Sequence, residues 1–204
     1  MITCYKDKFK KYYTLVKFTN SLLFIAVATS GVISSGDTVL YFDILPALVM
    51  CLIGDVILAI SEGATNKNLF LLGLGSFLIG HILFILLFNN IHPLSIYDFI
   101  LPIFAVLITF GLSKIKGMNV GNMLPCILLY SFFVSLLFFK SLGLLQVTVS
   151  LRNILLCVGS CLFFISDGII LFLYFYIKKH PLVTFFNLLT YYYGMFLIAL
   201  SIFY

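Results

Sequence analysis

Charged residues are scarce in this chain of 204 residues: Asp, Glu, Lys and Arg make up 9%, whereas hydrophobic residues make up 63%. A soluble domain carries about a quarter charged residues. A soluble fold of this composition would therefore lack the polar groups needed to cover its surface. The mean hydropathy of +1.20 agrees with this. We expect lipid to be the solvent.

The chain also lacks the sequence motifs of soluble enzymes. It has no P-loop, no dinucleotide-binding glycine motif, no G-x-S-x-G and no H-E-x-x-H. The five cysteines form no C-x-x-C pair, and four lie in apolar runs, so we interpret them as packing residues rather than disulfide or zinc ligands. No Arg-rich or Lys-aromatic patch indicates nucleic acid. We expect no metal, no cofactor and no nucleic-acid partner.

The chain does contain long, continuous apolar runs. A spanning helix needs about 20 such residues, and a transmembrane barrel would show alternating strands instead. We predict an all-α fold, a polytopic transmembrane helix bundle that forms a single domain over residues 1–204. About seven spans are expected, near Tyr13–Ile33, Val39–Ile60, Asn68–Phe88, Tyr97–Ser113, Gly121–Phe139, Arg152–Ile177 and Leu182–Phe203. An eighth span stays open, because Ser141–Leu151 is apolar but too short to cross alone.

Lysine placement predicts the orientation. Most lysines fall on one side of the predicted spans, and only Lys140 and Arg152 fall on the other. Positive residues favour the cytoplasmic side, so we expect a cytoplasmic N-terminus, in a cell membrane or endoplasmic reticulum membrane. The stretch 26–28 has the A-x-A form of a cleavage site, but the apolar run continues to Ile33, which favours an uncleaved first helix.

Two aspartates, Asp55 and Asp167, lie within predicted spans. A carboxylate at the bilayer centre costs about 2.5–3.5 kcal/mol on insertion scales, so each should face the bundle interior. One alternative is a purely structural role, with each Asp bonded to a neighbouring helix. Similar local sequences, GDVIL at 54–58 and SDGIIL at 166–171, also suit two three-helix repeats, as in some transporters.

Further polar residues accompany these aspartates. His81 lies mid-span and fits either an interhelical hydrogen bond or a site role. Lys17 and Asn20 share one helix face with Ser21, where Lys17 suits an interfacial anchor, a phosphate ligand or a carboxylate partner. Hydroxyl groups for the same cavity are available from Tyr130, Tyr191, Tyr192 and Tyr193.

Five segments resemble, in order, the YhhN-like family, also known as the transmembrane protein 86 lysoplasmalogenase family. They are LIGDVILA at 52–59, FLLGLGSFLIGHILF at 70–84, ILLYS at 127–131, GSCLFFISD at 159–167 and YYYGMFLI at 191–198. The similarity runs from about Lys17 to the C-terminus. The family commonly has Lys-Pro where this chain has Lys17-Phe18, and typically eight helices.

The resemblance implies a membrane hydrolase that cleaves the vinyl ether bond of lysoplasmalogens, giving a fatty aldehyde and a glycerophospho-alcohol. Such a reaction begins by protonating a carbon and passes through an oxocarbenium ion. Burial raises the pKa of a carboxyl, and two neighbouring carboxyls titrate apart, so that one can donate a proton while the other stays charged. We hypothesise that Asp167 is the acid and Asp55 the anion or water activator, although the roles could be exchanged.

The expected partners are a lysophospholipid substrate and membrane lipid, and the oligomeric state stays open. Substrate-binding roles are assigned to Lys17 and Asn20 near the phosphate, and to His81, Tyr130 and Tyr192 around the substrate or water. The alternative function is a small-solute or proton-coupled transporter that uses the same aspartates without chemistry.

Overall fold

The computed structural model describes residues 10–61, 67–177 and 180–204. Within these ranges seven helices or helix pairs are long and apolar enough to cross a membrane, which confirms the predicted all-α bundle. The long helices are α1 (Lys10–Ser35), α2 (Thr38–Ser61), α3 (Lys67–Ile91), α4 (Ile100–Ser113), α5 (Leu124–Val147), α6 (Leu151–Phe175) and α7 (Pro181–Leu200). Short 3-10 turns are η3 (Ile96–Phe99), η4 (Gly121–Met123) and η5 (Ser201–Phe203).

The segment Ser141–Leu151, where an eighth span was left open, does not form a separate span among the described residues. Helix α5 continues to Val147, well past the predicted end at Phe139, and α6 begins at Leu151. Polar side chains stabilise the short turn between them: Asn153 Nδ2 donates to Leu144 O at 3.0 Å and to Thr148 O at 2.9 Å. These bonds satisfy carbonyl groups at the end of α5, so the chain turns back at once.

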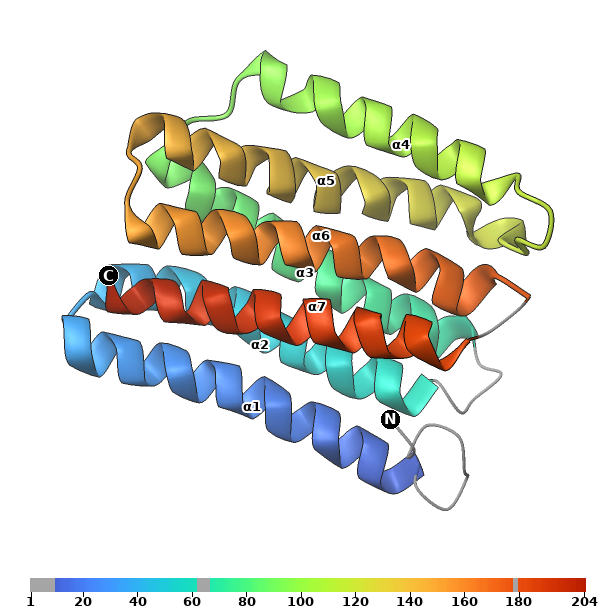
Figure 1. Cartoon of the computed structure of the whole chain (residues 1–204), viewed down its shortest axis with the longest axis horizontal. Helices are drawn as coiled ribbons and strands as arrows, with labels where there is room; N and C mark the ends of the chain where they lie inside the picture. Colours follow the sequence, from blue (N-terminus) through green and yellow to red (C-terminus); the bar gives the residue numbers. More distant parts are fainter. Residues whose placement is uncertain (1–9, 62–66, 178–179) are drawn as a thin grey trace.

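The helices form a closed ring with one helix outside it. Packing contacts join α1 to α2, α2 to α3, α3 to α5, α5 to α6, α6 to α7 and α7 back to α1. Helix α4 packs mainly on α5 and lies at one edge of the bundle, opposite α1 (Figure 1). Around the ring, the three consecutive helices α1, α2 and α3 are therefore followed by the three consecutive helices α5, α6 and α7. Helix α4 connects the two groups from outside the ring.

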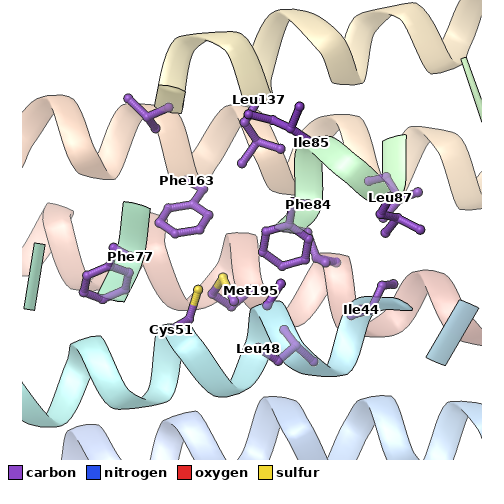
Figure 2. Close-up of a cluster of buried hydrophobic side chains, with 14 of the residues drawn as sticks. Ile44, Leu48, Cys51, Phe77, Phe84, Ile85, Leu87, Leu137, Phe163 and Met195 are labelled. Atoms are coloured by element: carbon purple, nitrogen blue, oxygen red, sulfur yellow. The ribbon is translucent and has the colours of Figure 1, made fainter. Parts of the chain in front are cut away.

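The ring is filled by apolar side chains from α2, α3, α5, α6 and α7. Figure 2 shows part of this core, where Leu48, Phe84 and Met195 meet, all three fully buried. Helices α6 and α7 come closest at Gly159 and Gly194, where a Cβ on either glycine would lie 2.8 Å from the carbonyl oxygen of the other. Small residues of this kind allow transmembrane helices to pack tightly.

The two ends of the bundle differ in charge. One end, here called the lysine-rich end, carries Lys67, Lys114 and Lys116 at the start of α3 and after α4. The other end carries two ion pairs, Arg152 with Asp37 at 2.8 Å and Lys140 with Asp98 at 3.1 Å. Further lysines that support the predicted orientation, Lys6, Lys8, Lys178 and Lys179, lie outside the described residues. The cytoplasmic N-terminus therefore stays a prediction.

Candidate active site

Asp55 lies in the interior of the ring. It belongs to α2, roughly 9 Å from the end of that helix at the helical rise per residue, and is 2% exposed. Its Oδ2 accepts hydrogen bonds from Ser21 Oγ of α1 at 2.6 Å and from Tyr191 OH of α7 at 2.8 Å. Short hydrogen bonds donated to a carboxylate oxygen stabilise a buried carboxylate. Asp55 is thus held by α1, which neighbours α2 in the ring, and by α7, which is not in direct sequence around the ring with α2.

Asp167 of α6 has a comparable setting. Its Oδ2 accepts a hydrogen bond from Tyr130 OH of α5 at 2.8 Å. His81 Nε2 of α3 lies 3.1 Å from the same oxygen, but the contact lacks the alignment of a hydrogen bond, and neither ring nitrogen has a hydrogen-bond partner among the described residues. Both contacts fall on Oδ2, so the described residues place no donor on Oδ1.

The two aspartates line one small cavity. Its volume is about 20 Å³, and its lining also includes Lys17, Phe77 and Tyr191. A polar space of this size holds a single water molecule. The structure therefore brings together two carboxyl groups, a lysine and room for water in the centre of the apolar bundle.

Lys17 is buried in the bundle. It is 6% exposed, lines the small cavity, and its Nζ lies 5.3 Å from the centre of the Tyr13 ring. An interfacial anchor would instead place its ammonium group in the head-group region. The burial of Lys17 thus favours a site role over the anchor interpretation.

Asn20 and Tyr192 lie beside the cavity rather than in it. Asn20 is half-buried and is not part of the cavity lining. The OH of Tyr192 donates to Lys17 O at 3.4 Å, which ties α7 to α1. Neither residue is therefore among those that line the small cavity.

A second, larger void reaches Asp167 from another side. This crevice of about 190 Å³ lies between α3, α4, α5 and α6 and is almost entirely apolar, with Phe70, Leu112 and Phe175 towards the lysine-rich end. Tyr130 and Asp167 supply polar atoms to its wall. Asp167 thus lines both the apolar crevice and the polar cavity, whereas Asp55 lines the cavity but not the crevice.

Comparison with protein-family models matches residues 12–202 to the YhhN family. The chain belongs to the YhhN family. This family includes lysoplasmalogenases, so the resemblance noted in the sequence is confirmed. Neither the comparison with curated proteins nor that with solved structures gave a match.

Only part of this YhhN-family site was predictable from the sequence. Tyr191 was one of four tyrosines expected to offer hydroxyl groups, but the substrate-binding role was assigned to Tyr192, whereas Tyr191 bonds Asp55. Two further groups were missed. Asn187 and Ser166 also line the cavity and bond one another, with Asn187 Nδ2 at 2.9 Å from Ser166 Oγ. The signal for Asn187 was its polarity within an apolar run. Adjacent tyrosines point about 100° apart on a helix, so only the rotation of α7 against α2 distinguishes them.

Proposed function

We propose that this YhhN-family protein is a membrane hydrolase that cleaves the vinyl ether bond of lysoplasmalogens. The observation that carries the proposal is a pair of buried carboxyl groups on one water-sized cavity, with one of them, Asp167, also open to an apolar crevice. A reaction that needs a proton donor, an anion and one water molecule matches these groups.

Asp167 is the proton donor in this proposal. It is the aspartate that a hydrocarbon chain in the crevice can reach. Tyr130 bonds its Oδ2, and His81 Nε2 lies 3.1 Å from the same oxygen, so Oδ1 is available to carry the proton towards the substrate. Geometry of this kind, a carboxyl group fixed on one oxygen and free on the other, suits general acid catalysis.

Asp55 is the anion. Hydroxyl groups of Ser21 and Tyr191 both donate to its Oδ2, a setting that favours the carboxylate. The net charge also supports one protonated and one ionised aspartate. A cluster of one lysine and two carboxyl groups is closest to neutral when one of the carboxyl groups keeps its proton. A low-dielectric interior disfavours any larger net charge.

The proposed reaction consumes one water molecule. Asp167 transfers its proton to the vinyl carbon that is not bonded to oxygen, and the double-bond electrons form the new C–H bond. The resulting oxocarbenium ion is stabilised by the nearby Asp55 carboxylate, in the manner of charge stabilisation in a preorganised site. Water then adds to the cationic carbon and gives a proton to Asp55. The hemiacetal collapses as Asp55 passes that proton to the glycerol oxygen and the hemiacetal hydroxyl gives its proton to Asp167. The C–O bond to glycerol breaks, a fatty aldehyde and a glycerophospho-alcohol leave, and both aspartates return to their starting states.

Purified protein incubated with a lysoplasmalogen should release fatty aldehyde. The matched control is a lysolipid with the same head group and a saturated ether, which has no double bond to protonate and should stay intact. In D2O the aldehyde should carry one deuterium on the carbon next to its carbonyl group. Failure to form aldehyde across a range of pH would refute the proposal.

One observation favours a second candidate, a small-solute or proton-coupled transporter. Helices α1–α2–α3 and α5–α6–α7 follow one another around the ring, and each middle helix carries one of the aspartates. Transporters built from repeats place their binding sites at such an interface. Uptake of an unmodified solute or of protons into proteoliposomes, without any lipid cleavage, would support the transporter instead.

A further inference from the structure

A polar hollow adjoins the apolar crevice at the lysine-rich end of the bundle. It has a volume of about 660 Å³, and its lining includes Lys67, Asn119 and Asn122. Phe70 and Phe175 line both the hollow and the crevice. The two voids are therefore neighbours, and these two side chains line both of them.

The crevice leads from this junction to the proposed reacting groups. Along α6, Phe175 and Asp167 are separated by roughly 12 Å at the helical rise per residue. Both residues belong to the crevice lining, as do Ile170 and Leu171 between them. The crevice thus connects the polar hollow to the Tyr130–Asp167 pair.

One wall of the crevice is loosely attached to the rest of the bundle. Helix α4 contributes Ala105, Ile108 and Thr109 to the lining. It packs on α5 and η3 but makes no substantial packing contact with α3 or α6 in the described part of the chain. The outer face of α4 is exposed. In a membrane, the spaces between α4 and helices α3 and α6 would therefore face lipid.

We infer that the hollow and the crevice form one binding site for a single-chain amphiphile. The polar end lies in the hollow, the linear section beyond it follows the crevice past Tyr130 and Asp167, and the tail leaves to the bilayer beside α4. This inference rests on the proposed function, because it places the lysophospholipid. With the polar end in the hollow, the chain that follows it enters the crevice lined by Tyr130 and Asp167.

Gly168 sets the width of this site next to Asp167. It lines the crevice, and a Cβ built on it would meet no atom within 4 Å. A larger side chain here would therefore fill the crevice without clashing with the protein. Gly111 of α4 offers a matched control, since its Cβ would also meet open space but it is not part of the crevice lining.

The test is equilibrium binding of a radiolabelled 1-O-alkyl lysophosphatidylcholine to the full chain in phosphatidylcholine nanodiscs. This probe has a saturated ether, so its binding is measured without cleavage. Gly168→Leu fills the part of the crevice that the ligand would occupy, so it should weaken binding about ten-fold, which corresponds to about 1.4 kcal/mol. Gly111→Leu should bind as the wild type does. Gly168→Ala should show a smaller loss, which keeps the test readable where Gly168→Leu does not fold.

Three results would overturn the inference: no saturable binding to the wild type, unchanged binding by folded Gly168→Leu, or an equal loss in Gly111→Leu. The reaction is judged separately. Graded loss of binding in the Gly168 series, together with no aldehyde from a lysoplasmalogen, would support the binding site and refute the hydrolysis. Aldehyde release that is unaffected in Gly168→Leu would support the hydrolysis and refute the binding site.

Discussion

At the scale of single residues, the site consists of hydroxyl groups that fix two carboxyl groups. Tyr130 and Tyr191 each donate to one aspartate at 2.8 Å. Their rings pack in the core, Tyr130 against His81 and Tyr191 against Phe77. Phenylalanine can keep this packing while it removes the donor, so the two contributions can be separated.

Tyr130→Phe and Tyr191→Phe should each lower the rate of aldehyde release by about 10- to 100-fold. Tyr191 donates to the Asp55 carboxylate, and Tyr130 donates to the negative charge that forms on Asp167 as its proton leaves. A hydrogen bond to a charged group is worth about 1.5–3 kcal/mol. Tyr193→Phe is the control, since Tyr193 is 63% exposed and should leave the rate unchanged. Rates are measured as aldehyde released by purified protein of equal folded fraction. Wild-type rates in both core variants would show that these hydroxyl groups do not serve the chemistry.

Some of the site residues could be predicted from the sequence and others could not. Asp55 and Asp167 were predictable, because a short acidic side chain in an apolar span must face inward. Their partners were only partly predictable. Ser21 shares a helix face with Lys17, but nothing in the sequence relates α1 to α2 closely enough to place its hydroxyl on Asp55. The position of Tyr191 depends on helix rotation, which apolar runs on all sides of a helix leave undefined.

At the scale of helices, the sequence predicted the spans well and their contacts poorly. Long apolar runs specify that a helix crosses the membrane. They do not specify the neighbour, because lipid tails are as apolar as the side chains in the interface. The peripheral position of α4 and the continuation of α5 to Val147 are features of packing and capping that composition does not reveal.

The close approach of α6 and α7 gives a stability prediction. Gly194→Ala places a Cβ against the backbone of α6, so the unfolding free energy should fall by about 1–3 kcal/mol. Gly75→Ala is the control: its Cβ meets open space, and alanine is the better helix former. Thermal unfolding in detergent measures both, and equal stability of the two variants would contradict this packing.

The connection between α3 and α4 depends on a buried lysine. Lys140 is fully buried, and its Nζ lies 3.0 Å from His92 Nδ1, 2.8 Å from Pro93 O and 3.1 Å from Asp98 Oδ2. Lys140→Met should lower the unfolding free energy by about 3 kcal/mol, because it leaves polar partners without their cation. Lys116→Met, at an exposed lysine, should be neutral. A neutral Lys140→Met would show that the connection is held in another way.

At the scale of the whole molecule, the account predicts a definite topology. Seven crossings place the two ends of the chain on opposite faces of the membrane, and the lysine distribution favours a cytoplasmic N-terminus. Tags at the two ends should therefore differ in accessibility to a membrane-impermeant reagent applied to sealed cells or vesicles, with only the C-terminal tag accessible from outside. Labelling of both tags, or of neither, would contradict an odd number of spans.

The central claim is that Asp55 and Asp167 act together across one cavity. It is tested most directly by aldehyde release from a lysoplasmalogen with Asp55→Asn and Asp167→Asn, each compared with the wild type at equal folded fraction. Acid–base catalysis contributes about 10²- to 10⁴-fold, so each variant should lose at least about 100-fold in rate while still binding the saturated ether lysolipid. Near-wild-type release by both variants would contradict the claim.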